Sequence, residues 1–261
     1  MLHSLKQSIF METYTTNLDN ENVTSVSQTE VTPIIVDKSI DKIVTKTKEE
    51  LDKEINDQID KNIDATQGYF QCLLNFGDLL DFNDGNVLAT LSSLNSHLRL
   101  ETDKNNNLII LMATHSKTGK YNSKLNQQLA NWNDIDELGE VYDSSTGFKM
   151  PVTNSMKSPD VSFILHSRLE VLENNSQFRT IAPDFVIELR SDTDRLKTVI
   201  AKMEEYIENG VRLGWLIDPQ TENVHIYRLN GNHTMQDFDE TLSGEDVLPK
   251  FGLNLRSIFK K

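Results

Sequence analysis

The stretch A-P-D-F-V-I-E-L-R-S-D-T-D, residues 182–194, decides how the rest of the chain is interpreted. Its apolar run predicts a strand from Phe185 to Arg190, and the alternation of side chains puts Glu188 and Arg190 on the same face. The neighbouring residues are apolar, so Glu188 is expected to be buried in mid-strand. A buried carboxylate is costly unless it is paired or binds a cation. Glu188 is therefore the residue that a function has to explain.

Two other stretches complete the predicted core. Residues 158–164, S-P-D-V-S-F-I, predict a strand that begins just after Asp160. Residues 211–219, V-R-L-G-W-L-I-D-P, predict a strand buried on both faces, because they are almost continuously apolar. The helix expected before this last strand has Ser191 as its N-cap and ends at an Asn-Gly pair, residues 209–210. A helix between two buried strands predicts a parallel pair joined by a right-handed crossover.

The predicted fold is therefore an α/β domain with a mixed central sheet and flanking helices. We place this domain at residues 66–261, and a hairpin over 98–112 belongs to it. Residues 1–65 are expected to form a variable N-terminal arm, polar and mostly disordered at first and then helical. The helical part, residues 38–63, carries a narrow apolar stripe among many charges. It is either a solvated arm or an element for dimerisation.

The composition limits the classes of function. The chain has 261 residues, with 26 Lys and Arg against 40 Asp and Glu, and its formal net charge is -14. Tight sequence-independent binding of nucleic acid needs a basic face, so this balance argues against it. The single cysteine, Cys72, excludes an internal disulfide framework and is typical of a reducing cytoplasm. No apolar run is long enough to span a membrane, and the first residues are not typical of a signal peptide.

Two carboxylates are expected to meet on the sheet. Asp160 and Glu188 lie on strands that sequence order makes neighbours, and if these strands pair, both acids can face one side. Carboxylate oxygens are suitable ligands for Mg2+ or Mn2+. Lys202 lies at the edge of the apolar stripe of the following helix, from which its ammonium can reach towards the sheet. A positive charge beside metal-bound carboxylates can orient a water or stabilise the transition state of phosphate hydrolysis.

These residues carry a resemblance to a known family. Between Leu98 and Arg228 the motifs P-D, P-D-F-V-I-E-L-R-S and K-M-E-E-Y-I-E-N-G follow one another, and together they resemble a large bacterial family of restriction-endonuclease-like proteins, the Uma-two family. That family belongs to the PD-(D/E)XK nuclease superfamily. The resemblance implies a restriction-endonuclease-like fold, with Asp160 as the Asp of the PD motif and Glu188 as the acid of the (D/E)XK strand.

Two positions depart from the superfamily pattern. The lysine of E-X-K is Arg190 here, and an arginine stays protonated, so it cannot act as a general base. Arg190 is expected either to contact phosphate or to clamp Glu188. In the Uma-two family the lysine function moves to the following helix, which implies that Lys202 takes that role. The helix that often carries a further Glu reads Y-N-S-K at 121–124, and Glu101 is a candidate replacement ligand.

Simpler roles for the same residues stay open at this point. Asp160 can cap a turn at the start of a strand, and Glu188 can be half of a buried ion pair that binds no metal. Lys202 can be an ordinary helix lysine whose stem packs against the apolar stripe. Asp184 follows the second Pro-Asp pair, but it is expected to lie about 13 Å from Glu188 along the strand, which favours a structural role.

The sequence therefore predicts a Mg2+- or Mn2+-dependent endonuclease acting on DNA, in which Asp160 and Glu188 hold the metal and Lys202 and Arg190 assist. The alternative is a catalytically weak or inactive protein of the same fold that acts as a binding or oligomerisation module through residues 38–63. The acidic balance favours this alternative, whereas the set of Asp160, Glu188 and Lys202 favours the enzyme. We expect a cytoplasmic homodimer with no attachment to a membrane.

Overall fold

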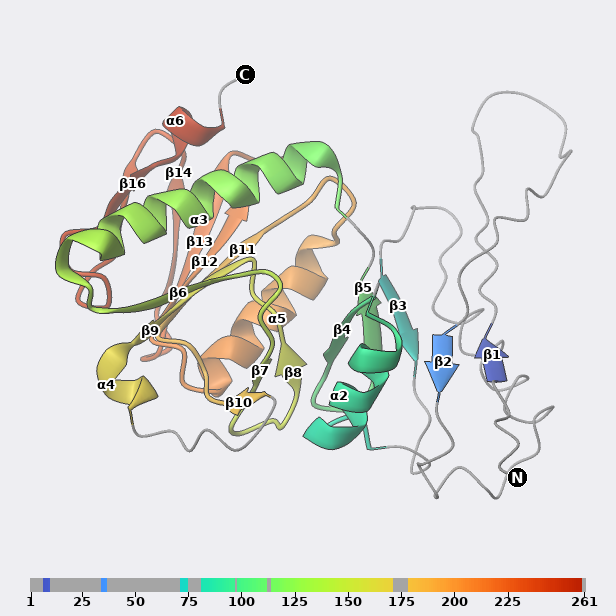
Figure 1. The fold of residues 1–261 in the computed structure, drawn as a ribbon. Coiled ribbons are helices and arrows are strands. Elements are labelled where there is room, and N and C mark those ends of the chain that lie inside the picture. Colours follow the sequence, from blue (N-terminus) through green and yellow to red (C-terminus); the bar gives the residue numbers. More distant parts are fainter. Residues whose placement is uncertain are drawn as a thin grey trace, which may run out of the picture. The chain divides into compact units, whose positions relative to one another are not determined.

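The computed structural model describes residues 81–96, 98–111, 114–170 and 178–259 in full, together with the backbone of strands at 7–9, 34–36 and 71–74 (Figure 1). The chain divides into two compact units, residues 1–112 and 113–261. The predicted domain boundary between residues 65 and 66 and the predicted helix over 38–63 lie outside the described residues. Both therefore stay predictions.

The described residues of the first unit form two small antiparallel sheets and a helix. Strands β1 (Gln7–Ile9) and β2 (Ile34–Val36) pair with each other. A second sheet has the order β3-β5-β4, with β3 at Gln71–Leu74, β4 at Arg99–Thr102 and β5 at Leu108–Leu111. The antiparallel β4–β5 pair confirms the predicted hairpin. Helix α2 (Gly85–Leu94) begins after Asp84, whose carboxylate accepts a hydrogen bond from the backbone N–H of Asn86.

A six-stranded mixed sheet forms the centre of the second unit. Its strand order is β14-β13-β12-β11-β9-β6, in which β11 and β12 are parallel and every other neighbouring pair is antiparallel. The bounds are β6 Gly139–Asp143, β9 Val161–Leu165, β11 Phe185–Leu189, β12 Leu213–Asp218, β13 Asn223–Arg228 and β14 His233–Asp237. The predicted mixed sheet and its parallel strand–helix–strand unit are confirmed.

Two long helices cover the two faces of this sheet: α3 (Ser116–Asp136) packs on one face and α5 (Leu196–Glu208) on the other (Figure 1). Helix α5 connects β11 to β12 and ends, as predicted, at Asn209 and at Gly210, which has a φ of +98°. The shorter elements are α4 His166–Leu169, α6 Leu255–Ile258, a sheet of β10 (Arg179–Thr180), β7 (Phe148–Lys149) and β8 (Met156–Lys157), and the pair β15 (Thr241–Ser243) and β16 (Gly252–Asn254). Within the described ranges, no helix is long and apolar enough to cross a lipid bilayer.

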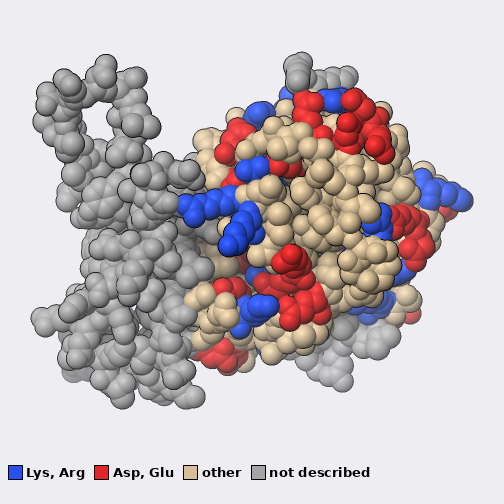
Figure 2. All heavy atoms as spheres, turned by 180° about the vertical axis from the view of Figure 1, so that it is seen from behind, with Lys and Arg blue, Asp and Glu red and all other residues tan. Residues whose placement is uncertain are grey.

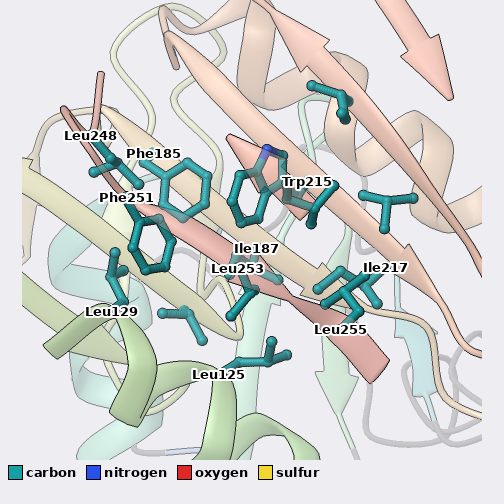
Figure 3. Close-up of a cluster of buried hydrophobic side chains, with 14 of the residues drawn as sticks. Leu125, Leu129, Phe185, Ile187, Trp215, Ile217, Leu248, Phe251, Leu253 and Leu255 are labelled. Carbon is teal, nitrogen blue, oxygen red and sulfur yellow. The ribbon is translucent and has the colours of Figure 1, made fainter. Parts of the chain in front are cut away.

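Alternation along β11 divides its side chains between two apolar clusters. Phe185 joins the cluster on the α3 side, where the Trp215 ring packs edge-on against it with ring centroids 4.8 Å apart (Figure 3). Val186 joins the cluster on the α5 side, together with Met203. A Cβ at Gly214 would lie 2.6 Å from the Met203 Cε, so the glycine lets α5 pack closely on β12. This packing holds α5 against the face of β11 that carries Val186 and Glu188.

The start of α5 differs from the prediction. Ser191 is not the N-cap: the helix begins at Leu196, and Arg195 before it makes no side-chain capping bond. Instead, the Asp194 carboxylate accepts a hydrogen bond of 2.7 Å from the Ser191 backbone N–H. A short acidic side chain that binds a nearby backbone group competes with helix formation. This local bond explains why the helix starts later than the capping pattern predicts.

A buried ion pair fixes the C-terminal half of α5. The Lys157 ammonium lies 3.0 Å from the Glu205 carboxylate, and the two side chains are only 4% and 10% exposed. The Ser155 hydroxyl donates a hydrogen bond to the other carboxylate oxygen of Glu205. A charge buried in this way is tolerated because it is both paired and hydrogen-bonded. The pair ties the β7–β8 segment to α5.

Replacing Glu205 with alanine is expected to lower the free energy of unfolding by about 3 kcal/mol or more, because the Lys157 ammonium then stays buried without its partner. Urea denaturation followed by circular dichroism measures this loss. Glu204→Ala is the matched control: Glu204 is exposed on the same helix, so its removal is expected to change stability by no more than about 0.5 kcal/mol. Equal stability of the two variants would contradict the role given to the pair.

Candidate active site

Asp160 directly precedes strand β9, and Glu188 lies in the neighbouring strand β11. Strands β9 and β11 pair antiparallel, with Val161 opposite Ile187. The same register continued by one residue places Asp160 opposite Glu188, as expected if these strands pair. Directly opposite residues of an antiparallel pair have Cβ atoms about 4.5–5.5 Å apart, so the two acidic side chains start from adjacent points of the sheet.

Asp160 is held at the end of the sheet by groups from two other elements. Its Oδ2 accepts a hydrogen bond of 2.9 Å from the backbone N–H of Leu189, the residue after Glu188 in β11. Its Oδ1 accepts a hydrogen bond of 2.8 Å from the side-chain Nδ2 of Asn122 in α3. Each carboxylate oxygen therefore has a donor, and the orientation of the Asp160 carboxylate is fixed.

Glu188 is buried on the α5 side of the sheet, with only 7% of the residue exposed. Its Oε1 lies 2.8 Å from the Lys202 ammonium and accepts a hydrogen bond of 2.8 Å from the Tyr206 hydroxyl. Tyr206 is itself fully buried. A positive charge and a hydroxyl thus offset the cost of burying the carboxylate at a single oxygen. The buried ion pair that the sequence left open is present.

Lys202 reaches the sheet as predicted. It lies in α5 one helical turn before Tyr206, and its ammonium is 5.8 Å from the centroid of the Tyr206 ring. The side chain is 19% exposed, far less than a solvated lysine of a surface helix. Its positive charge is directed onto Glu188, which distinguishes Lys202 from an ordinary helix lysine.

Arg190 is bound by Asp218 and by the backbone of Asp194, and its predicted clamping of Glu188 stays a prediction. Its Nη1 donates to the Asp218 carboxylate at 2.7 Å, and its Nε donates to the Asp194 backbone carbonyl at 3.1 Å. The reason is the parallel register of β11 and β12, which when continued by one residue brings Arg190 beside the fully buried Asp218. The guanidinium is held in place there, and its contact with phosphate stays a prediction.

His225 of β13 lies near the Arg190–Asp218 pair. Burial lowers the pKa of His225, the nearby His233 lowers it further, and Asp218 opposes both effects. The His225 Nδ1 lies 3.3 Å from the His233 Nε2, and the two rings stack. Because its pKa is lowered, the His225 imidazole is expected to be neutral near pH 7. Beside Asp218, Arg190 then carries a permanent positive charge, whereas His225 does not.

Two other acids singled out in the sequence have different surroundings. Asp184 is fully buried, lies 3.1 Å from the Arg168 guanidinium and accepts the Leu165 backbone N–H at 3.0 Å, as expected for a structural residue. Glu101 is buried in β4, which belongs to the first unit. Its assignment as a further metal ligand stays a prediction.

The donor atoms of the site suit a hard divalent cation. The continued β9–β11 register places Asp160 opposite Glu188, and the Asn122 Oδ1 is buried with no hydrogen-bond partner among the described residues. Oxygen donors of this kind are typical ligands of Mg2+ and Mn2+, whereas Zn2+ prefers nitrogen and sulfur. No group of three or more His, Cys, Asp and Glu side chains that could hold a metal occurs in the described part of the chain. The site therefore offers two acids and one neutral oxygen.

Two residues of this site, Tyr206 and Asn122, could not be predicted from the sequence. Tyr206 falls in the apolar stripe of α5, and its only signal is a position four residues after Lys202, the spacing at which helical side chains meet. Asn122 is 38 residues from Asp160 along the chain, and only the packing of α3 brings the two together.

Comparisons with known proteins agree with this fold. A solved structure, described as a putative nuclease belonging to DUF820 from Anabaena variabilis ATCC 29413, shares the fold with a TM-score of 0.54 and 20% sequence identity. The match covers 61% of this chain and 89% of that one. No curated protein matches the chain.

The mixed sheet between two helix layers therefore defines a restriction-endonuclease-like domain. Residues 88–256 match the Uma2 family, described as "Putative restriction endonuclease". Because this match spans more than half of the chain, the chain belongs to the Uma2 family. The resemblance inferred from the sequence is confirmed.

Tyr206→Phe is expected to lower the free energy of unfolding by about 1.5–3 kcal/mol, because it removes a hydrogen bond to the buried Glu188 carboxylate. Chemical denaturation measures the loss. Tyr227→Phe is the matched control: Tyr227 packs in the same apolar cluster as Tyr206, but its buried hydroxyl has no hydrogen-bond partner among the described residues. The control is expected to be neutral or slightly stabilising, and a similar loss in both variants would argue against the Tyr206–Glu188 bond.

Proposed function

We propose that the protein is a metal-dependent endonuclease that hydrolyses phosphodiester bonds of DNA. The observation that carries the proposal is a second acid, Asp160, at the position facing the Glu188–Lys202 pair, whose charged atoms are 2.8 Å apart. Lys202 alone is enough to pair with the buried Glu188 carboxylate. The structural ion pair therefore does not need the second acid, Asp160, which adds negative charge to the site. The family to which the chain belongs is described in terms of the same activity.

Asp160 and Glu188 are the residues that would hold Mg2+ or Mn2+. When bound, the ion lowers the pKa of a coordinated water and stabilises negative charge on the phosphate. The protein supplies the fixed positions of the ligands, since each carboxylate accepts hydrogen bonds from residues of other elements. Such outer partners orient metal ligands and raise their affinity for the ion.

The two basic residues would act on the substrate. The Lys202 ammonium, already beside Glu188, would orient the attacking water or stabilise the charge that develops on the phosphate. Arg190 would contact a phosphate group of the DNA substrate. A guanidinium has five N–H donors, and the bonds to Asp218 and to the Asp194 carbonyl use two of them.

The net charge of -14 favours a second candidate function. Figure 2 shows Lys and Arg side chains interspersed with Asp and Glu over the described part of one face, with acidic groups at its upper and lower edges. In this alternative the chain is a catalytically weak or inactive nuclease-fold protein that acts as a binding or oligomerisation module. A cytoplasmic homodimer assembled through residues 38–63 would fit either function.

The full-length protein is expected to cleave supercoiled DNA in the presence of Mg2+ or Mn2+, and Asp160→Ala and excess EDTA are each expected to abolish cleavage. Agarose electrophoresis measures the conversion of plasmid to nicked and linear forms. Single-stranded DNA and RNA tested in parallel define the substrate class. Equal inactivity of wild type and variant, in folded samples, would favour the binding module. Equal activity of both would place the reaction outside this site.

Glu188→Gln is expected to abolish Mn2+ binding, because a neutral amide replaces a charged ligand. Lys202→Met is expected to retain Mn2+ binding and to lose cleavage, since it removes a positive charge that acts on the phosphate and not on the metal. Titration calorimetry measures the first property and plasmid cleavage the second. Unchanged Mn2+ affinity in Glu188→Gln would refute the assignment of the metal ligands.

A further inference from the structure

Asn122 connects α3 to Asp160 through one end of its side-chain amide. Its Nδ2 lies 2.8 Å from the Asp160 Oδ1. An ionised carboxylate can only accept hydrogen bonds, so the amide has to present its N–H group there; the opposite orientation would set two oxygens against each other. The bond to Asp160 therefore determines where the Asn122 Oδ1 points.

This orientation leaves the Asn122 Oδ1 buried, with no hydrogen-bond partner in the described ranges of the chain. Buried side-chain oxygens are nearly always satisfied, so an exception of this kind indicates a bound ion, a bound water or a functional role. The exception lies next to a carboxylate that we assign to a cation site. The Asn122 Nδ2 thus binds Asp160, a proposed metal ligand, whereas the Asn122 Oδ1 still needs a cation or a hydrogen-bond donor.

We propose that Asn122 is a further cation-binding residue of this site, whose Oδ1 supplies a neutral oxygen ligand to the divalent ion while its Nδ2 holds Asp160. Asparagine carbonyl oxygens are ordinary ligands of hard divalent cations. The inference rests on the proposed function, because it needs a cation bound by Asp160 and Glu188. The inference adds a third protein ligand, Asn122 of α3, to the proposed metal site.

The neutrality of this ligand has an electrostatic consequence. Asp160 and Glu188 contribute negative charge and Lys202 offsets only part of it, so the site without a cation stays negative. Asn122→Asp would put a third acid beside Asp160, and like charges at that distance repel each other until a cation binds. This substitution is therefore expected to destabilise the cation-free protein and to strengthen cation binding. Asn122→Ala removes the ligand without adding charge.

Mn2+ is the probe, and two measurements on the full-length protein test the proposal. By titration calorimetry, Asn122→Ala is expected to bind Mn2+ at least about tenfold more weakly than the wild type. By thermal unfolding, Asn122→Asp is expected to show a lower Tm without Mn2+ and a larger Mn2+-induced rise in Tm than the wild type. Asn126→Ala is the matched control, since the Asn126 Nδ2, one turn along α3, donates to the Tyr142 backbone carbonyl at 3.4 Å. This control is expected to bind Mn2+ as the wild type does.

The outcomes separate this inference from the proposed function. Wild-type Mn2+ affinity in Asn122→Ala, with binding lost in Glu188→Gln, would overturn the role of Asn122 and leave the metal site standing. Weakened binding in both Asn122→Ala and Asn122→Asp would also overturn it, because only the Nδ2 bond to Asp160 would then matter. If the wild-type protein binds no Mn2+, both proposals fall together.

Discussion

The burial of Glu188 is the constraint on which the arrangement of the second unit depends. A carboxylate on a strand that is covered on both faces needs a positive charge or hydrogen-bond donors inside the fold. From α5, Lys202 supplies the positive charge and Tyr206 donates a hydrogen bond. These two residues are one helical turn apart, so a single face of α5 has to lie on β11. The helix cannot slide along the sheet without separating Glu188 from both partners. The cost of burying one acid thus determines where a whole helix packs.

Other contacts keep α5 at that position. Gly214 lets the helix approach β12 so closely that a Cβ there would lie 2.6 Å from the Met203 side chain. Towards the C-terminal end of the helix, the buried Lys157–Glu205 pair ties it to the β7–β8 segment. These residues serve the site indirectly, because they restrict the motion of the helix that carries Lys202. A ligand held by a rigid element loses less freedom when it binds, which is the physical advantage of building a site on packed strands and helices.

The strands and their pairing are more predictable from the sequence than the partners of the polar side chains. Alternation is local, and it suffices to predict strand β11 with Glu188 buried in it, while the apolar run after Asp160 predicts strand β9. Partners depend on register and packing, which no local pattern encodes. Arg190 meets Asp218 because of the β11–β12 register. Asn122 meets Asp160 only because α3 packs across the sheet, and for the same reason the role of its amide has no sequence signal.

An acidic protein can act on a phosphate only if the charge near the scissile bond differs from the total. Charges on the surface are screened over about 8 Å at physiological ionic strength, so the net charge of -14 has little influence inside the site. In the proposed function a divalent ion would neutralise Asp160 and Glu188, and the positive charge of Lys202 would no longer be offset. The local charge would change from negative to positive when the ion binds. Phosphate binding is then coupled to metal binding, which suits a short contact at the scissile group better than a long basic groove.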